Sequence, residues 1–330
     1  MNTNTMKWLL RREFWENKGS MFWAPLVVGA LLVLLVGGTV GYGIIGHGVP
    51  GHIVINGQTV ANGGMSAAIS LDSRIMIAKV ASGMYLATAS PLFFMLVFAV
   101  FFYCLNSLYD ERRDRSILFW KSLPVSDGMT VLSKAAMAMI VAPLITIVLA
   151  VAASLALLVV VCIALGTQGM NMFGTMLASP DLYLSPLRLL SLLPVYVVWA
   201  LPTVGWLMLV SSWARSKPFI WAVGVPLTGL LLLQWTNAAM QKISGTSLAI
   251  MPYAQDLVAR ILGGVVPGIW FTYRTDLAPD LRPTASGIDV GAIVSNSYAS
   301  LAGLDAWFGV ALGALMLFGA IRLRRWRDEG

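Results

Sequence analysis

The chain has 330 residues, of which 58% are hydrophobic and only 11% are charged. An average globular chain carries roughly 25% charged residues, so this composition excludes an ordinary soluble fold and indicates a protein that lies largely in the lipid bilayer. The formal net charge of +7 would fit a nucleic-acid binder if the basic residues formed one patch. They are instead distributed between apolar segments along the whole chain, and we expect no nucleic-acid partner.

Six apolar segments are long enough to cross a membrane, because a spanning helix needs about 20 predominantly apolar residues. The predicted spans cover residues 21–46, 82–109, 133–164, 189–213, 218–237 and 300–321. The last of them contains a single acid, Asp305, close to the end where it can reach the headgroup region. No Pro-, Ser- or Gly-rich linker separates a soluble module from these spans. The sequence therefore predicts one all-α integral membrane domain over residues 1–330.

The distribution of Lys and Arg predicts the orientation of the chain, because cytoplasmic loops retain an excess of positive charge. With six crossings, the two termini and the loops after the second and fourth spans share one side, which holds 15 of the 22 basic residues. The opposite side holds 7, of which four lie in one long loop. We therefore expect both termini in the cytoplasm.

The spans contain no charge at their centres, which argues against proton coupling, since proton relays place acids or histidines inside the membrane. The two histidines, His47 and His52, both lie in the first outer loop, away from other metal ligands or a nucleophile. We expect no enzyme activity, no metal and no cofactor in this chain. Cys104 and Cys162 fall near opposite faces of the membrane and are predicted to be free, buried thiols.

The most concentrated charge lies in the loop after the second span, residues 110–127. This loop opens with Asp-Glu-Arg-Arg-Asp-Arg and continues through an apolar strip that contains Trp120. Helical spacing places Glu111 four residues before Arg115, which is favourable for an ion pair. An ordinary solvated loop explains the basic residues of this segment, but it does not explain three acids and a tryptophan.

The end of this loop carries a helix start signal. Pro124 ends the preceding turn, since the residue before a proline is pushed away from helical geometry. Ser126 or Asp127 can then serve as the N-cap, because a short polar side chain accepts a hydrogen bond from a free N–H of the first turn. The third membrane helix is predicted to begin near Met129.

At these residues the sequence resembles the type-2 ATP-binding-cassette (ABC) exporter permeases. In that family the loop after the second helix reads approximately acid-Arg-x-x-Gly-Thr-Leu-Glu-x-Leu-x-x-x-Pro-Val-Ser, with a Lys at the start of the third helix. Here residues 115–126 read Arg-Ser-Ile-Leu-Phe-Trp-Lys-Ser-Leu-Pro-Val-Ser, and Lys134 follows. Ser116, Ile117 and Phe119 replace the Gly, Thr and Glu of the family pattern. The order of an amphipathic N-terminal helix, six spans and a long outer segment is also similar across essentially the whole chain.

The resemblance implies that the charged loop is a coupling helix that docks into a separate ATPase subunit. A mixed-charge strip with an aromatic side chain suits an interface with a polar rim and a buried centre. The candidate contact residues are Glu111, Arg112, Arg113, Asp114, Arg115, Trp120 and Lys121. ATP and magnesium would bind to that partner and not to this chain.

The resemblance also implies the function of a non-catalytic transmembrane (permease) subunit of an exporter, located in a bacterial inner membrane. It would move an unidentified lipid-like, drug-like or peptide substrate outward, together with two ATPase subunits and a second permease copy or a paralogue. Two other classes stay open. One is an ATP-independent membrane scaffold or assembly factor that recruits a cytoplasmic partner through the charged loop, and the other is a secondary carrier.

Residues 5–19 form a second candidate, an amphipathic helix that lies on the inner leaflet. Basic and aromatic residues suited to the membrane interface occur along it. They are Lys7, Trp8, Arg11, Arg12 and Trp15. Gly19 is predicted to end the helix. The helix is similar to the connecting helix of the family, and a plain juxtamembrane helix with no part in coupling is the alternative.

Residues 238–299 form a long outer segment, and loops of this length normally carry structure or function. An apolar stripe at helical spacing predicts a short surface helix within it. The stripe consists of Ile250, Tyr253, Leu257 and Ile261. Asp256 and Arg260 are predicted to pair on the opposite face. Residues 263–271 are similar to the re-entrant segment that precedes the last helix in the family, and a plain extracellular cap is the alternative.

Overall fold

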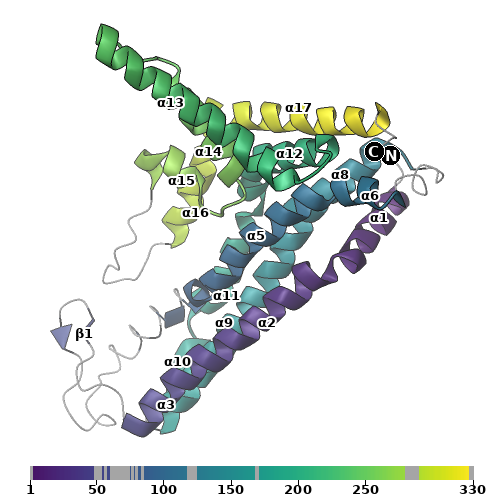
Figure 1. Cartoon of the computed structure of the whole chain (residues 1–330). Coiled ribbons are helices and arrows are strands. Elements are labelled where there is room, and N and C mark those ends of the chain that lie inside the picture. The colour runs from purple at the N-terminus through teal and green to yellow at the C-terminus, as the bar shows by residue number, and fades with distance from the viewer. Residues whose placement is uncertain are drawn as a thin grey trace.

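The computed structural model describes residues 3–47, 54–55, 58–59, 75, 78, 81–82, 85–116, 125–167, 171–278 and 290–326. Within these residues the regular structure is helical, apart from one antiparallel pair of two-residue strands, β1 (Val54–Ile55) and β2 (Gln58–Thr59). The all-α class predicted from the sequence is confirmed. Figure 1 shows that long helices dominate the molecule.

The first half of the chain forms a short helix and three long helical runs. The elements are α1 (Thr3–Glu16), η1 (Gly19–Trp23), α2 (Ala24–Leu32), η2 (Val33–Gly37), α3 (Gly38–His47), η3 (Tyr85–Ala89), α5 (Ser90–Asn106), α6 (Tyr109–Arg113), α8 (Asp127–Ala136), η4 (Met137–Val141) and α9 (Ala142–Thr167). The η elements are short stretches of π or 3-10 helix. η2 joins α2 to α3 and η4 joins α8 to α9, while a turn at residues 107–108 separates α5 from α6; each of these pairs belongs to one run.

The second half contains two further long runs, the long helix α13 and several short helices. The elements are α10 (Phe173–Leu177), α11 (Pro180–Ser191), α12 (Leu193–Trp213), η5 (Ile220–Gly224), α13 (Val225–Ser244), α14 (Met251–Gly263), α15 (Trp270–Tyr273), η6 (Thr275–Leu277), α16 (Val290–Ala299), η7 (Ser300–Ala302) and α17 (Leu304–Trp326). The long outer segment predicted from the sequence is thus largely helical where the structure describes it.

Five helical runs in the described part of the chain are long and apolar enough to cross a membrane. They cover Gly19–Gly46, Tyr85–Arg113, Asp127–Thr167, Pro180–Trp213 and Leu304–Trp326. These runs correspond to five of the six predicted spans, and the span predicted at residues 218–237 falls in η5 and α13, outside this set. Leu34 and Phe94 are among the large apolar side chains that the runs expose. A multi-pass membrane protein follows, because lipid can cover surfaces of this kind and water cannot.

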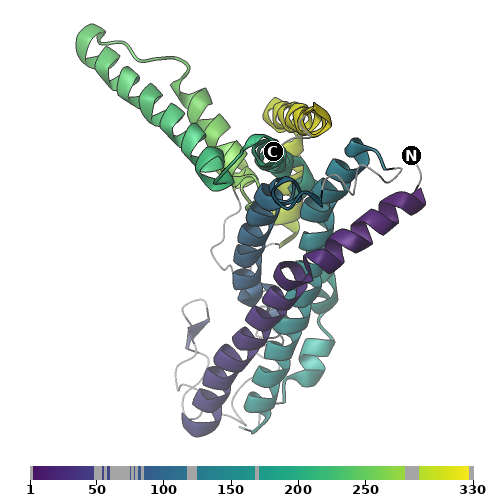
Figure 2. The same ribbon diagram turned by 45° about the vertical axis from the view of Figure 1, so that its right-hand side comes forward.

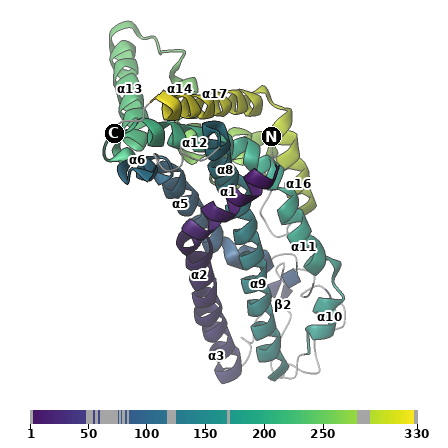
Figure 3. The same ribbon diagram turned by 90° about the vertical axis from the view of Figure 1, so that its right-hand side faces the viewer.

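The helices fall into two groups that meet at one end. The runs that contain α2, α5 and α9 pack against one another, and α12 and α17 lie together across one end of them (Figures 1 and 3). α13 and α14 form a hairpin that extends away from both groups (Figure 2). The main core lies where α5, α8, η4 and α12 meet. Cys104 lies in this core, Cys162 is buried elsewhere, and both thiols are free, as predicted.

α12 and α17 run in the same direction and make the most extensive helix contact described. The indole N–H of Trp199 donates to the hydroxyl of Ser300 just before α17, at 3.3 Å. Further along, a Cβ added to Gly205 would lie 2.6 Å from the carbonyl oxygen of Gly313. Only glycine allows this approach. Small residues at the contact let the two backbones touch, which is a common basis of helix association in bilayers.

The short helix predicted in the outer segment is confirmed as α14. Of the predicted apolar stripe, Ile261 is buried and the other members are exposed. Arg260 is 94% buried, with its guanidinium carbon 4.5 Å from the Trp199 ring and 5.2 Å from the Tyr273 ring. Tyr253 of the predicted apolar stripe is 75% exposed instead. Burial lowers the pKa of Arg260 by desolvation. The prediction that Arg260 pairs with Asp256 was wrong because a planar guanidinium can be buried by stacking on aromatic rings.

The segment at residues 263–271 packs against α12. The amide N–H of Gly264 donates to the Thr203 hydroxyl at 2.8 Å, and the same hydroxyl donates to the carbonyl oxygen of Arg260 at 2.7 Å. A Cβ at position 264 would lie only 2.4 Å from the carbonyl oxygen of Trp199. Val265 and Trp270 are buried on either side of the turn. The outer segment is therefore held on the first half of α12.

Replacing Gly313 by Leu is expected to destabilise the fold, because its Cβ would lie 2.7 Å from the backbone carbonyl of Leu201. Overpacking of this kind costs about 1–3 kcal/mol, and more where the backbone cannot move. The melting temperature of the detergent-solubilised protein, followed by size-exclusion chromatography after heating, should fall. Gly229→Leu on α13 is the matched control, since nothing lies within 4 Å of its Cβ position. Equal melting temperatures for the two variants would contradict the close contact.

Candidate functional site

The charged residues after the second run begin in a helix that is fastened to the end of α12. α6 follows α5 after a turn, and the amide N–H groups of Leu108 and Tyr109 both donate to the hydroxyl of Ser211, at 3.1 and 3.0 Å. N–H groups in the first turn of a helix have no partner within it, so this one hydroxyl satisfies two of them. The start of α6 is therefore fixed against the last turn of α12.

Arg112 makes a second attachment between α6 and α12. Its guanidinium donates to the carbonyl oxygens of Ser211 at 2.6 Å and Ala214 at 2.8 Å. The last carbonyls of a helix lack partners within the helix and carry the negative end of its dipole, so a cation binds there favourably. Arg112 thus faces the protein and holds α6 in place.

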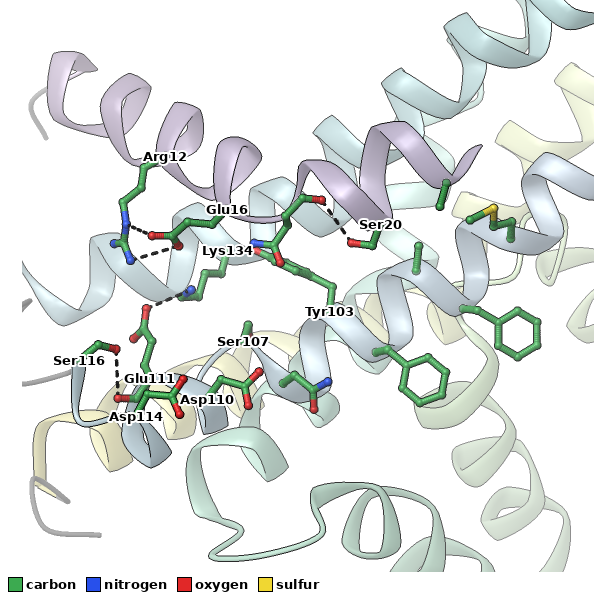
Figure 4. A pocket seen from close by; sticks show the side chains of 17 residues that line it. Arg12, Glu16, Ser20, Tyr103, Ser107, Asp110, Glu111, Asp114, Ser116 and Lys134 are labelled. Atoms are coloured by element: carbon green, nitrogen blue, oxygen red, sulfur yellow. Dashed lines mark hydrogen bonds and ion pairs between the residues drawn. The ribbon is translucent and has the colours of Figure 1, made fainter. Parts of the chain in front are cut away.

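Glu111, the neighbour of Arg112, belongs to a buried group of charges that we call the ion cluster. Its members are Glu13 of α1, Glu111 of α6, Asp127 and Lys134 of α8, and Arg324 of α17. The Nζ atom of Lys134 lies 2.8 Å from Glu13 Oε1 and 3.1 Å from Glu111 Oε1. Figure 4 shows Lys134 pointing from α8 toward Glu111 on α6. One ammonium group thereby joins α1, α6 and α8.

Arg324 brings the last helix into the ion cluster. Its guanidinium binds the second carboxylate oxygen of Glu111 and lies 3.1 Å from Asp127 Oδ1. Tyr103 of α5 donates its hydroxyl to Glu13 Oε2 at 3.0 Å. Four helices that are distant in the sequence therefore meet around two cations and three carboxylates, with a fifth attached through the tyrosine.

The burial of these charges decides what the cluster does. Glu13, Lys134 and Arg324 expose 1%, 3% and 4% of their surfaces. Removing such groups from water costs several kcal/mol each, and only their mutual pairing and hydrogen bonds compensate. A buried cluster adds little net stability compared with apolar packing, but losing one member leaves a partner charge buried without compensation. We infer that the cluster specifies how the four helix ends are arranged.

At the end of α6 the chain exposes a short charged turn, Arg113 to Arg115. Arg113 lies 3.4 Å from Asp110 and 3.1 Å from Asp114, and its side chain is 60% exposed. Arg115 has a φ of 55°, a left-handed conformation that ends the helix. The predicted helical ion pair between Glu111 and Arg115 was therefore wrong, because the helix ends before Arg115 and Glu111 pairs with buried cations. This exposed turn carries the charges that a partner can reach.

The seven residues predicted to contact an ATPase separate into three sets. Glu111 and Arg112 point inward and hold helices together. Arg113, Asp114 and Arg115 are exposed. Trp120 and Lys121 lie outside the described residues.

The N-terminal helix α1 has one exposed face and one buried face. Trp8 and Trp15 are 67% and 55% exposed, with Arg11 5.7 Å above the Trp8 ring, and Arg12 binds Glu16 at 2.7 Å. The remaining residue of the predicted interfacial set, Lys7, is exposed as well.

The opposite face of α1 is docked on the protein. Leu9 is buried beside Glu13, and α1 packs against α8. α1 ends at Glu16, before Gly19, and Gly19 is the first residue of the π-helical turn η1. Figure 3 shows the bend between α1 and α2 at this point. α1 is thus clamped to the membrane helices through Glu13.

The predicted helix start after the charged loop is confirmed. The Ser126 hydroxyl accepts a hydrogen bond from the amide of Met129 at 3.3 Å, and α8 begins at Asp127. Asp127 in turn reaches Arg324. The N-cap therefore places the first acid of α8 beside the last turn of α17.

Sequence reasoning missed Glu13, Tyr103 and Arg324 as site residues. One signal was present, because Glu13 is an acid between Leu9, Leu10 and Phe14 on the apolar face of a basic helix. An acid in that position needs a buried cation. Which cation it meets depends on tertiary structure, and nothing local to Lys134 or Arg324 identifies either of them.

Comparison with protein-family models, curated proteins and solved structures finds no match to this chain. The resemblance to ABC exporter permeases therefore depends on the loop residues and the order of the spans. In the part of the chain that the structure describes, no three His, Cys, Asp or Glu side chains are grouped so that they could hold a metal ion. The described site is built for mechanical connection between helices.

Lys134→Met should destabilise the protein by about 3–5 kcal/mol, because it leaves Glu13 and one oxygen of Glu111 buried without a cation. Adding Glu13→Gln should recover part of the loss, since one uncompensated carboxylate is then removed. The free energy of unfolding in mixed micelles, from titration with a denaturing detergent, measures this coupling. Arg113→Gln is the control and should have little effect, because that arginine is exposed. Additive effects of Lys134→Met and Glu13→Gln would contradict a buried pair.

Proposed function

We propose that the chain is the transmembrane subunit of an ABC exporter, driven by ATP that a separate ATPase subunit hydrolyses. The observation that carries this proposal is the exposed turn Arg113–Arg115, which is connected through α6 to the ends of α1, α8, α12 and α17. A force applied to this turn would act on several membrane helices at once. The loop resemblance supports the same role.

Six crossings with both termini in the cytoplasm belong to this proposal. α12 and α17 both end at the site, the first through Arg112 and the second through Arg324. Because the two helices run in the same direction, the chain between them has to return to the far end of the molecule. α13 begins near the end of α12 and leads away from it, which supports α13 as the remaining crossing (Figure 1). Leu231, Leu232 and Trp235 give it an exposed apolar surface suited to lipid.

The partners in this proposal are those that the family resemblance implies. Two ATPase subunits would carry ATP and magnesium, and two permease chains, identical or paralogous, would form the path. ATP-driven closure would push the turn Arg113–Arg115, and the ion cluster would transmit the displacement to the helix ends. The cargo would be lipid-like, drug-like or peptidic and would leave a bacterial cytoplasm through the inner membrane.

The N-terminal helix would support the same interface. Its exposed face, with Trp8, Arg11 and Trp15, would lie on the membrane surface and against a cytoplasmic partner. Its inner face reaches Lys134 through Glu13. Movement of α1 would therefore reach the same cluster as movement of α6.

Exchanging the charges of Arg113 and Asp114, by Arg113→Glu with Asp114→Arg, should leave folding intact but weaken association with the ATPase. Both side chains are exposed, so the fold does not require them. A reversed charge at an interface repels a partner that the original charge attracted. Co-purification of the ATPase with the tagged chain, measured by quantitative mass spectrometry, reports this change.

A matched control exchanges Arg274 and Asp276, an exposed ion pair of 2.9 Å in the outer segment. That exchange should leave co-purification unchanged. If the Arg113 and Asp114 exchange also leaves it unchanged, the coupling role of the turn is wrong. If no ATPase accompanies even the unaltered chain, the scaffold and secondary-carrier alternatives gain support.

A further inference from the structure

A cavity of about 790 Å³ lies beside the ion cluster, between α1 and the start of α2 on one side and α5 and α6 on the other. We call it the amphipathic groove. It is lined by Arg12, Glu16, Asn17, Ser20, Ala24, Met95, Phe98, Ala99, Phe102, Tyr103, Asn106, Ser107, Asp110, Glu111, Asp114, Ser116 and Lys134. Figure 4 shows Arg12 and Glu16 on one wall, facing Asp110, Glu111 and Asp114 on the other.

The polarity of the groove changes along its length. Its cytoplasmic-loop end is lined by carboxylates, hydroxyls and an arginine, whereas the other end is lined by Met95, Phe98 and Phe102. Phe98 is 48% exposed and Phe102 is 46% exposed, so this wall is open to the surroundings of the molecule. A ligand that fills the groove therefore needs a polar head and an apolar tail.

The groove lies where the headgroups of a bilayer are expected. The wall formed by α5 and α6 belongs to a run that is able to cross a membrane, and the opposite wall passes from α1 into Ser20 and Ala24, at the start of another such run. The polar end of the groove therefore coincides with the ends of these two runs. Trp15 and Trp23, on the same side of the molecule as the first wall, are more than half exposed. Exposed tryptophans of this kind mark the membrane interface. The aromatic wall then faces the hydrocarbon and the carboxylates face the headgroup layer.

The charges that line the groove favour one kind of polar headgroup in the ligand. Four carboxylates line it, those of Glu16, Asp110, Glu111 and Asp114, against two cations, Arg12 and Lys134. Glu111 is compensated within the ion cluster by Lys134 and Arg324, and Glu16 pairs with Arg12. Asp110 and Asp114 share Arg113 at the rim, which leaves one negative charge between them. A primary ammonium can donate to several carboxylates, while Arg12 on the opposite wall suits a phosphate. A quaternary ammonium cannot donate, and a glycerol head carries no cation.

We propose that the amphipathic groove binds one phospholipid with a primary ammonium headgroup, whose acyl chain lies along Phe98 and Phe102. The ammonium lies near Asp110 and Asp114, and the phosphate lies near Arg12. This site does not depend on the proposed ATPase partner. If both termini are cytoplasmic, as proposed above, the bound lipid belongs to the inner leaflet; the leaflet is the one feature of the site that depends on that orientation. A partner helix inserted in the groove is the competing occupant.

The test uses the full chain in detergent with an equimolar mixture of phosphatidylethanolamine, phosphatidylcholine and phosphatidylglycerol, followed by native mass spectrometry. We expect one phosphatidylethanolamine per chain, preferred over the other two by roughly fivefold, as expected for an added charge-assisted hydrogen bond. Asp110→Asn with Asp114→Asn should abolish this preference and shift binding toward phosphatidylglycerol, because Arg113 is then unpaired at the rim. Asp256→Asn with Asp276→Asn, two exposed acids of the outer segment, is the charge-matched control and should keep the preference.

A second measurement locates the lipid. Phosphatidylethanolamine with a photoreactive acyl chain should crosslink mainly to the peptide that contains Phe98 and Phe102, and the crosslink should be lost with Phe98→Ala but kept with Phe318→Ala on α17. Uniform crosslinking, or equal retention of the three lipids by the unaltered chain, would overturn the proposal. So would protection of a Ser20→Cys thiol by a soluble partner protein but not by lipid, which would identify the competing occupant.

Discussion

The ammonium group of Lys134 lies between the carboxylates of Glu13 and Glu111, and the rest of this end of the molecule depends on that contact. Burying any one of these three charged side chains without the others would cost several kcal/mol. The ends of α1, α6 and α8 therefore have to come together for these side chains to be buried. Arg324 extends the requirement to α17 through the second oxygen of Glu111. In a bilayer the lipid tails are as apolar as the helix surfaces, so hydrophobicity does not favour one helix neighbour over another. Polar contacts such as these then determine which helix ends meet.

This constraint explains why the charged loop divides as it does. The same short helix supplies Glu111 and Arg112 to the interior and presents Arg113 to Arg115 to the outside. The run that begins at Asp127 has 41 residues, which is about 60 Å of helix and twice the thickness of the hydrocarbon layer. Its first turns, which hold Lys134, can therefore stand outside the hydrocarbon. A rigid platform of helix ends at the membrane surface is a suitable place to receive force from a soluble motor.

The helices could be predicted from the sequence because long apolar runs have one stable form in lipid, where every backbone group needs an internal partner. The N-cap at Ser126 was also local and therefore predictable. The ion cluster was not, because Glu13 and Lys134 are 121 residues apart and Glu111 and Arg324 are 213 apart. The burial of Arg260 was missed for a related reason. In a membrane protein an apolar stripe can face lipid, so amphipathicity alone does not say whether Tyr253 or Arg260 lies on the buried side of α14.

The most direct test of the account is to purify the tagged chain from its native membrane in a mild detergent and identify what accompanies it. The account predicts a nucleotide-binding subunit in a one-to-one ratio with this chain, together with ATPase activity that depends on magnesium. Elution of the chain without such a subunit, under conditions that keep other membrane complexes intact, would contradict the exporter assignment. The ion cluster would then have only a structural role.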